Sequence, residues 1–128
     1  MSMTDEITAA KAVIASHEEL SRAGDLAGVL TNVADDIVLV VPNIPLVEGK
    51  SAFEKVYSNM FGMGQWDFEH DYSGADVAGD TVILQGVARG TFTSTEGETS
   101  PIENNFLLVL ERIGGSYKVW RGAFGPVN

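Results

Sequence analysis

The second half of the sequence constrains the fold most, because it consists of one β-strand pattern after another joined by short turns. From Trp66 to Tyr72 apolar or aromatic residues alternate strictly with acidic ones, which is the pattern of a strand with two different faces. Glycines mark turns at 78–80 and 114–115, and a polar segment at 94–100 separates two apolar runs. We predict an antiparallel meander of four strands, Trp66–Tyr72, Thr81–Thr93, Ile102–Arg112 and Tyr117–Phe124.

The first half of the sequence is predicted to be mainly helical. A helix with apolar residues at helical spacing is expected to begin at Thr4, as N-cap, and to end at Gly24, as C-cap. Asp25 is expected to cap a short second helix. The β-branched run Ile37–Val41, ended by Pro42, predicts one early strand.

A third helix is predicted to begin at a capping box of Ser51 and Glu54 and to end at the glycines of 62–64. Its expected inner face contains Phe53 and Tyr57. Helices followed by a meander indicate an α+β fold with the helices on one face of the sheet. The length of 128 residues predicts a single domain, 1–128.

Composition excludes several classes of function. There are 18 acidic against 8 basic residues, and the net charge of −10 disfavours binding to nucleic acids and to anionic membranes. Without cysteine the chain forms no disulfide, thiolate nucleophile or cysteine-based zinc site, and no histidine or acidic spacing indicates another metal site. The first residues lack the features of a signal peptide, and Ile37–Val41 is too short to span a bilayer, so a cytoplasmic protein is expected.

The positions of the two histidines raise the question of function. His17 lies within the apolar face of the first helix, where it is either an acid/base or hydrogen-bonding group for a ligand, or a neutral core residue bonded to Tyr57 or a backbone carbonyl. His70 shares a strand face with Trp66 and Phe68. It is either a second polar group in a cavity or a half-exposed residue near a strand end.

Two long segments, 23–57 and 106–124, resemble the SnoaL-like proteins of the nuclear transport factor 2-like superfamily, which includes ketosteroid isomerases and polyketide cyclases. The matching features are "AGDL", "ADD", a proline after the first strand, "EGKSAF" and the closing hairpin "FLLVLERIGGSYKVWRGAF". The resemblance implies that three helices pack on a strongly curved antiparallel sheet and form a conical pocket. It leaves the function open, because one fold hosts many activities.

The catalytic groups of ketosteroid isomerases are a tyrosine, an aspartate base and a protonated aspartate. By the resemblance these positions fall on His17, Val41 and Leu107, and a further pocket tyrosine coincides with Tyr57. Valine and leucine carry no proton, so the resemblance does not extend to ketosteroid isomerisation by that machinery. The two polar positions, His17 and Tyr57, are retained as the candidate catalytic residues.

The resemblance therefore implies an apolar pocket for a small, uncharged, polycyclic or polyketide-like molecule, with no cofactor. The expected ligand-binding residues are Val41, Trp66, Phe68, His70, Asn105, Leu107, Trp120 and Phe124. Asn105 is included because it shares a strand face with Leu107, although a solvated strand start is the alternative. For Trp120 and Phe124 the alternative is simple core packing.

Three functions remain open on the sequence. The protein is an isomerase or cyclase that uses His17 as acid/base with Tyr57 orienting it, a non-catalytic binding module, or a structural dimer. A homodimer is expected because members of the superfamily often pair through the sheet. We further predict that Trp66 and Trp120 border one cavity and that His17 lies within hydrogen-bond reach of Tyr57.

Overall fold

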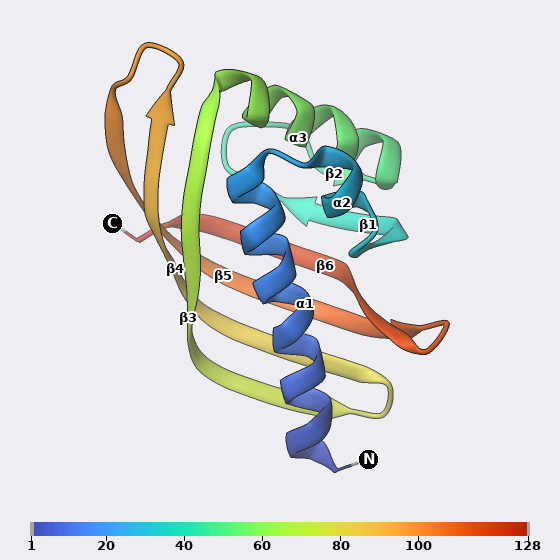
Figure 1. Ribbon diagram of the computed structural model, residues 1–128. Helices are drawn as coiled ribbons and strands as arrows, with labels where there is room; N and C mark the ends of the chain where they lie inside the picture. Colours follow the sequence, from blue (N-terminus) through green and yellow to red (C-terminus); the bar gives the residue numbers. More distant parts are fainter. Residues whose placement is uncertain (1, 128) are drawn as a thin grey trace.

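A long N-terminal helix lies across the concave face of a curled six-stranded sheet in the computed structural model, which describes residues 2–127 (Figure 1). The helices are α1 (Met3–Ala23), α2 (Leu26–Leu30) and α3 (Lys50–Met63). The strands are β1 (Val33–Val40), β2 (Val47–Glu48), β3 (Gly64–Ala78), β4 (Thr81–Ser94), β5 (Thr99–Ile113) and β6 (Ser116–Pro126). The order across the sheet is β2-β1-β6-β5-β4-β3. The predicted α+β architecture is confirmed.

The predicted meander is confirmed, because β3, β4, β5 and β6 pair antiparallel in chain order. In the predicted pairing of the first two strands, Trp66 lies opposite Phe92 and Tyr72 opposite Gly86. β3 continues beyond Tyr72 to Ala78, and the register of its pairing with β4 shifts between Tyr72 and Gly74. β1 joins the other edge of the meander by pairing parallel with β6, so the sheet is mixed.

Local signals position α1 at both ends. The N-cap of α1 is Ser2, two residues before the predicted Thr4, and it exchanges capping hydrogen bonds with Asp5. The helix ends at Gly24, whose left-handed backbone (φ 68°) confirms the predicted C-cap.

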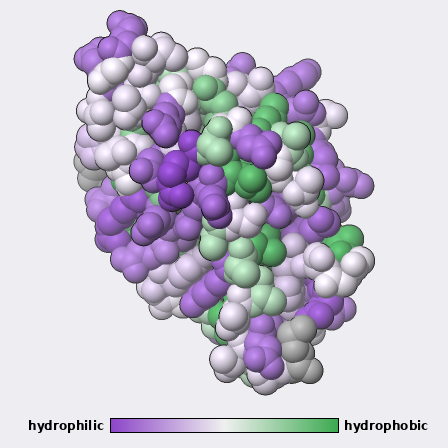
Figure 2. Space-filling view, in the orientation of Figure 1, coloured by the Kyte–Doolittle hydropathy of each residue, from purple (hydrophilic) through white to green (hydrophobic). Residues whose placement is uncertain are grey.

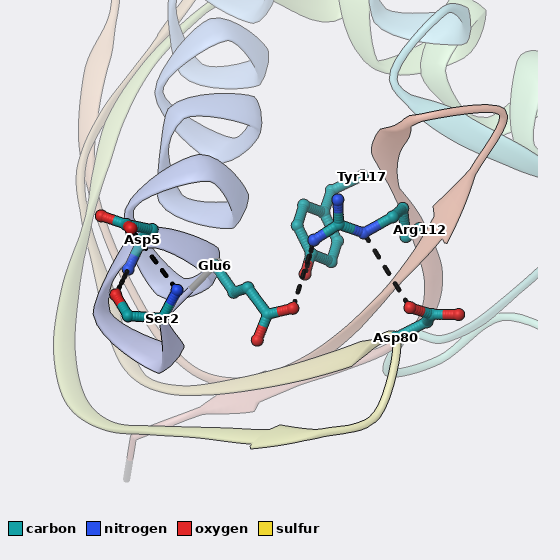
Figure 3. A network of polar contacts seen from close by, with 6 residues as sticks. All are labelled: Ser2, Asp5, Glu6, Asp80, Arg112 and Tyr117. Carbon is teal, nitrogen blue, oxygen red and sulfur yellow. Dashed lines mark hydrogen bonds and ion pairs between the residues drawn. The ribbon is translucent and has the colours of Figure 1, made fainter.

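Arg112 of β5 joins the start of α1 to the sheet. It donates to Glu6 at 3.2 Å and to the Tyr117 hydroxyl at 3.1 Å (Figure 3). These contacts hold the first turn of α1 against the β5–β6 hairpin.

The predicted capping box of α3 is wrong. The N-cap is Gly49, with φ 89°, and no side chain caps the helix. The N–H of Gly49 donates instead to the Ile37 carbonyl at 2.7 Å, so the chain enters the helix through a left-handed turn tied to β1. The predicted inner face is confirmed, because Phe53 and Tyr57 are buried.

The described core joins α1, α3 and the concave face of the sheet. Its most enclosed side chains include Ile14, Phe53, Leu84 and Leu110. Hydrophilic side chains cover most of the face that carries α1, and apolar ones form scattered patches (Figure 2). Within residues 2–127, no helix combines the length and apolarity needed to cross a bilayer.

Candidate functional site

The helices do not fill the concave side of the sheet, and a cavity of about 440 Å³ remains between them. Its size lies within the range of small-molecule sites, roughly 300–1,000 Å³. The structure places seven of the residues named from the sequence on its wall: His17, Val41, Tyr57, Trp66, Phe68, His70 and Phe124. Most of the remaining wall is aliphatic or aromatic, with Asn59 and Asn104 as further polar residues.

The bend of the β3–β4 hairpin shapes one side of this cavity. Phe68 pairs with Gly90, and Tyr72 pairs with Gly86. A Cβ atom at Gly90 would lie 1.9 Å from the Asp67 carbonyl oxygen, and one at Gly86 would lie 2.0 Å from that of Asp71. Glycine thus permits a close approach of the two strands where the sheet curls, and the alternation of β3 turns its aromatic residues inward.

Three residues predicted to line the pocket lie outside it. Asn105 and Leu107 are exposed on the opposite face of β5, where Leu107 is 45% exposed, and their neighbours Asn104 and Leu108 line the cavity instead. Side chains alternate along a strand, so an offset of one residue moves every side chain to the other face. The alternation correctly placed Asn105 beside Leu107, but the resemblance assigned that pair to the wrong face.

Trp120 is the third correction. Its indole N–H donates to the Asp36 carboxylate at 3.2 Å, and the Arg121 guanidinium stacks 3.8 Å above its ring centre. Val119 lines the cavity in its place. In the pairing of β5 with β6 the register shifts between Val109 and Leu110, and on β6 this shift falls close to Trp120. The prediction that both tryptophans border one cavity is therefore wrong for Trp120.

The predicted contact between His17 and Tyr57 is confirmed. The imidazole Nε2 and the Tyr57 hydroxyl lie 3.0 Å apart, and the rings meet edge to face at 5.5 Å. Tyr57 is held in turn by Phe53, which stacks on it at 4.2 Å. Helices α1 and α3 thus present one polar pair within an aromatic part of the wall.

Burial keeps both members of this pair neutral. It lowers the pKa of His17 from 6.5 to about 4, an effect to which a charged His70 adds and which Glu18 opposes. Burial also raises the pKa of Tyr57 above its ordinary value of 10.0. The other ring nitrogen of His17, Nδ1, is enclosed and finds no hydrogen-bond partner among the described residues. The pair therefore exchanges a neutral hydrogen bond at physiological pH.

A second polar pair joins α1 to β3, and one of its members was missed from the sequence. Oxygen Oε2 of Glu18 accepts from the backbone N–H of His70 at 2.6 Å and lies 2.8 Å from its ring Nδ1. The His70 side chain is only 3% exposed and that of Glu18 15%. No local pattern distinguishes Glu18 from the exposed Glu19, because only the packing of α1 on β3 brings it to His70. Within residues 2–127 no group of three potential metal ligands is found.

Known structures share this architecture at low sequence identity. A ketosteroid isomerase-like protein from Erwinia carotovora atroseptica aligns with a TM-score of 0.85 and 21% identity over 96% of this chain and 97% of its own. A nuclear transport factor 2-like protein of unknown function from Pseudomonas putida aligns with a TM-score of 0.78 and 20% identity, over 95% of this chain and 87% of its own. A nuclear transport factor 2-like protein with a cystatin-like fold from Novosphingobium aromaticivorans aligns with a TM-score of 0.77 and 14% identity, over 98% of this chain and 84% of its own.

The sequence itself carries the family signal. No curated protein sequence matches it significantly. The sequence model of the SnoaL-like domain matches residues 13–120, which include every residue of the cavity wall except Phe124. The protein belongs to the family of SnoaL-like domains.

Proposed function

We propose that the protein binds a small, uncharged and largely apolar organic molecule in the cavity between the sheet, α1 and α3. The observation that supports this most directly is the 440 Å³ cavity itself, whose wall is mainly apolar and carries a few inward polar groups. This combination is typical of small-molecule sites. Among the described residues of the wall there is no lysine or arginine to balance an anionic ligand.

The His17–Tyr57 pair supplies the hydrogen bond that orients the ligand. If His17 carries its proton on Nε2, it donates to the Tyr57 oxygen, and the tyrosine proton is available to a ligand carbonyl. If the proton is on Nδ1, the Tyr57 hydroxyl donates to Nε2 and its oxygen accepts from a ligand hydroxyl. The pair therefore suits ketones and alcohols of polycyclic or polyketide type.

Catalysis with His17 as the acid/base has less support than binding. With a pKa of about 4, the imidazole is neutral near pH 7, so it lacks the second ring proton that an imidazolium would donate as a general acid. It is also a weaker base than an unperturbed histidine. We therefore assign His17 to hydrogen bonding.

The two tryptophans provide an internal test of binding. Trp66 lines the cavity, whereas Trp120 lies outside it beside Asp36. We expect 2-tetralone, a neutral bicyclic ketone, to quench the indole fluorescence in a saturable way. Trp66→Phe should abolish the response, and the matched variant Trp120→Phe should retain it. A response absent from the wild type across a panel of neutral bicyclic and tricyclic ketones and alcohols, or one that depends on Trp120, would contradict the proposal.

A further inference from the structure

The contact between Glu18 and His70 defines the protonation of the imidazole. A carboxylate oxygen can only accept, so the hydrogen bond of 2.8 Å requires the ring proton on Nδ1. The same oxygen accepts from the backbone N–H of His70, which ties the carboxylate to the strand as well as to the ring. In the neutral imidazole Nε2 then carries a lone pair and acts as an acceptor.

The ring that carries this lone pair is held by aromatic neighbours. Phe106 meets it edge to face at 4.7 Å, Phe68 does so at 5.8 Å, and Tyr72 lies nearly parallel at 6.3 Å. His70 lines the cavity, so this rigid imidazole belongs to the proposed ligand site. A carboxylate that holds an imidazole in one orientation among apolar side chains preorganises that imidazole to act as a general base.

The four imidazole nitrogens of the two histidines differ in whether they have a hydrogen-bond partner and whether they are enclosed, and Nε2 of His70 differs from the other three in this combination. Nε2 of His17 is engaged by Tyr57, and Nδ1 of His17 is enclosed. Nδ1 of His70 is engaged by Glu18. Nε2 of His70 has no partner within residues 2–127 and is not among the enclosed polar atoms. It is the imidazole nitrogen that a ligand in the cavity can reach.

We propose that His70 is a catalytic base that removes a proton from carbon in the bound ligand, and that Glu18 is its positioning residue. The proposal rests on the proposed function, because it requires a neutral ligand in the same cavity. In the step, a C–H bond next to a carbonyl breaks and its proton joins Nε2. The electron pair passes to the carbonyl oxygen and gives an enolate, and the Glu18 carboxylate balances the imidazolium.

The site also holds a donor for that oxygen. Tyr57 lines the same cavity and keeps its proton, since burial raises its pKa. The base would come from β3, whereas the position just before Pro42 that matches the isomerase base holds Val41. Carbon acids such as ketones with an acidic α-hydrogen are therefore the substrate class that we assign to this site.

Proton abstraction can be measured without knowing the natural substrate. The probe is 5-nitrobenzisoxazole, a neutral planar molecule in which a base takes the C3 proton, the N–O bond breaks, and a nitrile and a coloured phenolate form. We expect the wild-type protein to accelerate this reaction in a saturable way. His70→Gln should lower kcat by about 100-fold, in the usual range for losing a general base.

Variants of two glutamates separate positioning from general charge effects. In Glu18→Gln the amide oxygen can still accept both hydrogen bonds, but it no longer balances the imidazolium. We expect kcat to fall by about tenfold while KM stays nearly unchanged. The matched variant Glu69→Gln removes the same charge from the exposed face of β3 and should leave both constants unchanged. Thermal unfolding of each variant confirms that it is folded.

The outcomes distinguish this proposal from the proposed function. Binding is followed with 5-nitroindazole, which has the shape of the probe but no N–O bond to break. Binding without saturable turnover, or turnover that survives His70→Gln, would overturn the assignment of His70 and leave the binding function intact. Absence of binding by this compound and by neutral ketones would overturn both.

Chemical modification gives a test that needs no turnover. Diethyl pyrocarbonate acylates neutral imidazole nitrogens that it can reach. The folded protein should take up one ethoxyformyl group, on His70, and unfolding in urea should expose the second histidine of the chain. Modification of His17 in the folded protein, or of neither histidine, would show that Nε2 of His70 is not open to the cavity.

Discussion

At the scale of single residues, the contact between His17 and Tyr57 links the stability of the fold to the wall of the cavity. Both side chains are buried, and each supplies the other with a hydrogen-bond partner at 3.0 Å. A buried polar group left without its partner costs about 1–3 kcal/mol, whereas removing both partners together costs much less. The pair therefore stabilises the folded protein, whatever it contributes to binding.

This leads to a double-mutant prediction. Tyr57→Phe should lower the free energy of unfolding by about 1–3 kcal/mol, because it leaves both nitrogens of His17 without a partner. His17→Leu should also destabilise, because it leaves the Tyr57 hydroxyl unpaired. The double variant should lose clearly less than the sum of the two single changes. Urea denaturation measures all four proteins, and strictly additive losses would show that the contact contributes nothing.

The pKa of His17 predicts how stability depends on pH. The unfolded chain binds this proton near pH 6.5 and the folded protein only near pH 4, so acidification through that window favours unfolding. The stabilising contribution is complete above pH 6.5, declines as the pH falls, and is lost below about 4. At 1.36 kcal/mol per pKa unit the loss is roughly 3 kcal/mol.

The measurement is a comparison of the wild type with His17→Leu. Free energies of unfolding in urea are followed from neutral pH down to the lower pKa, and the difference between the two proteins removes the contribution of the many carboxylates. We expect the wild type to lose more stability than the variant on acidification. Parallel curves would contradict a lowered pKa for His17.

At the scale of elements, the pairing of β3 with β4 depends on glycines where the sheet bends. A methyl group at Gly90 would collide with the backbone of Asp67 in β3. β3 cannot shift away from this methyl group without also displacing Phe68, the next residue of the strand. We expect Gly90→Ala to lower the free energy of unfolding by about 1–3 kcal/mol, as overpacking usually does. The variant should also bind neutral ketones less tightly, because Phe68 lines the cavity.

A matched glycine in α3 serves as the control. Around Gly62 nothing lies within 4 Å of an added Cβ, and its backbone is not left-handed. Gly62→Ala should therefore raise the free energy of unfolding by up to about 1 kcal/mol through helix propensity alone. Thermal and urea unfolding of both variants check the expectation, and equal effects at the two glycines would contradict it.

At the scale of the whole molecule, charge and cavity favour the same kind of ligand. The chain has a net charge of −10, and the described cavity wall carries no basic side chain other than imidazole. Burying a carboxylate in such a site is costly, because nothing replaces its hydration. The overall field also lowers the local concentration of anions.

The corresponding prediction compares two ligands of similar shape. Tetralin-2-carboxylate should bind at least about tenfold more weakly than 2-tetralone near neutral pH. Titration calorimetry measures both affinities, and raising the ionic strength should reduce only the long-range part of the difference. Equal or tighter binding of the carboxylate would show that the site is built for anions.

Much of the secondary structure was predictable because its signals are local. The alternation at Trp66–Tyr72 predicted a strand, the cap at Gly24 ended the first helix, and the spacing of His17 and Tyr57 on their helices turned both inward. Each of these depends on a few consecutive residues. The capping box at Ser51 failed although its signal is local, because the Gly49 contact to Ile37 across the chain determined how the helix begins.

The sequence by itself determined the helices, the antiparallel meander and the pairing of its residues into faces, since these follow from the periods of helix and strand. Only the tertiary structure decided which face of β5 looks inward, because alternation distinguishes two faces but curvature and covering helices choose between them. That choice placed Asn104 in the cavity wall and Leu107 outside. It also decided that β1 runs parallel to β6 and that Glu18 meets His70, 52 residues away. Contacts between distant segments leave no mark in local periodicity, and they determine the chemistry of this site.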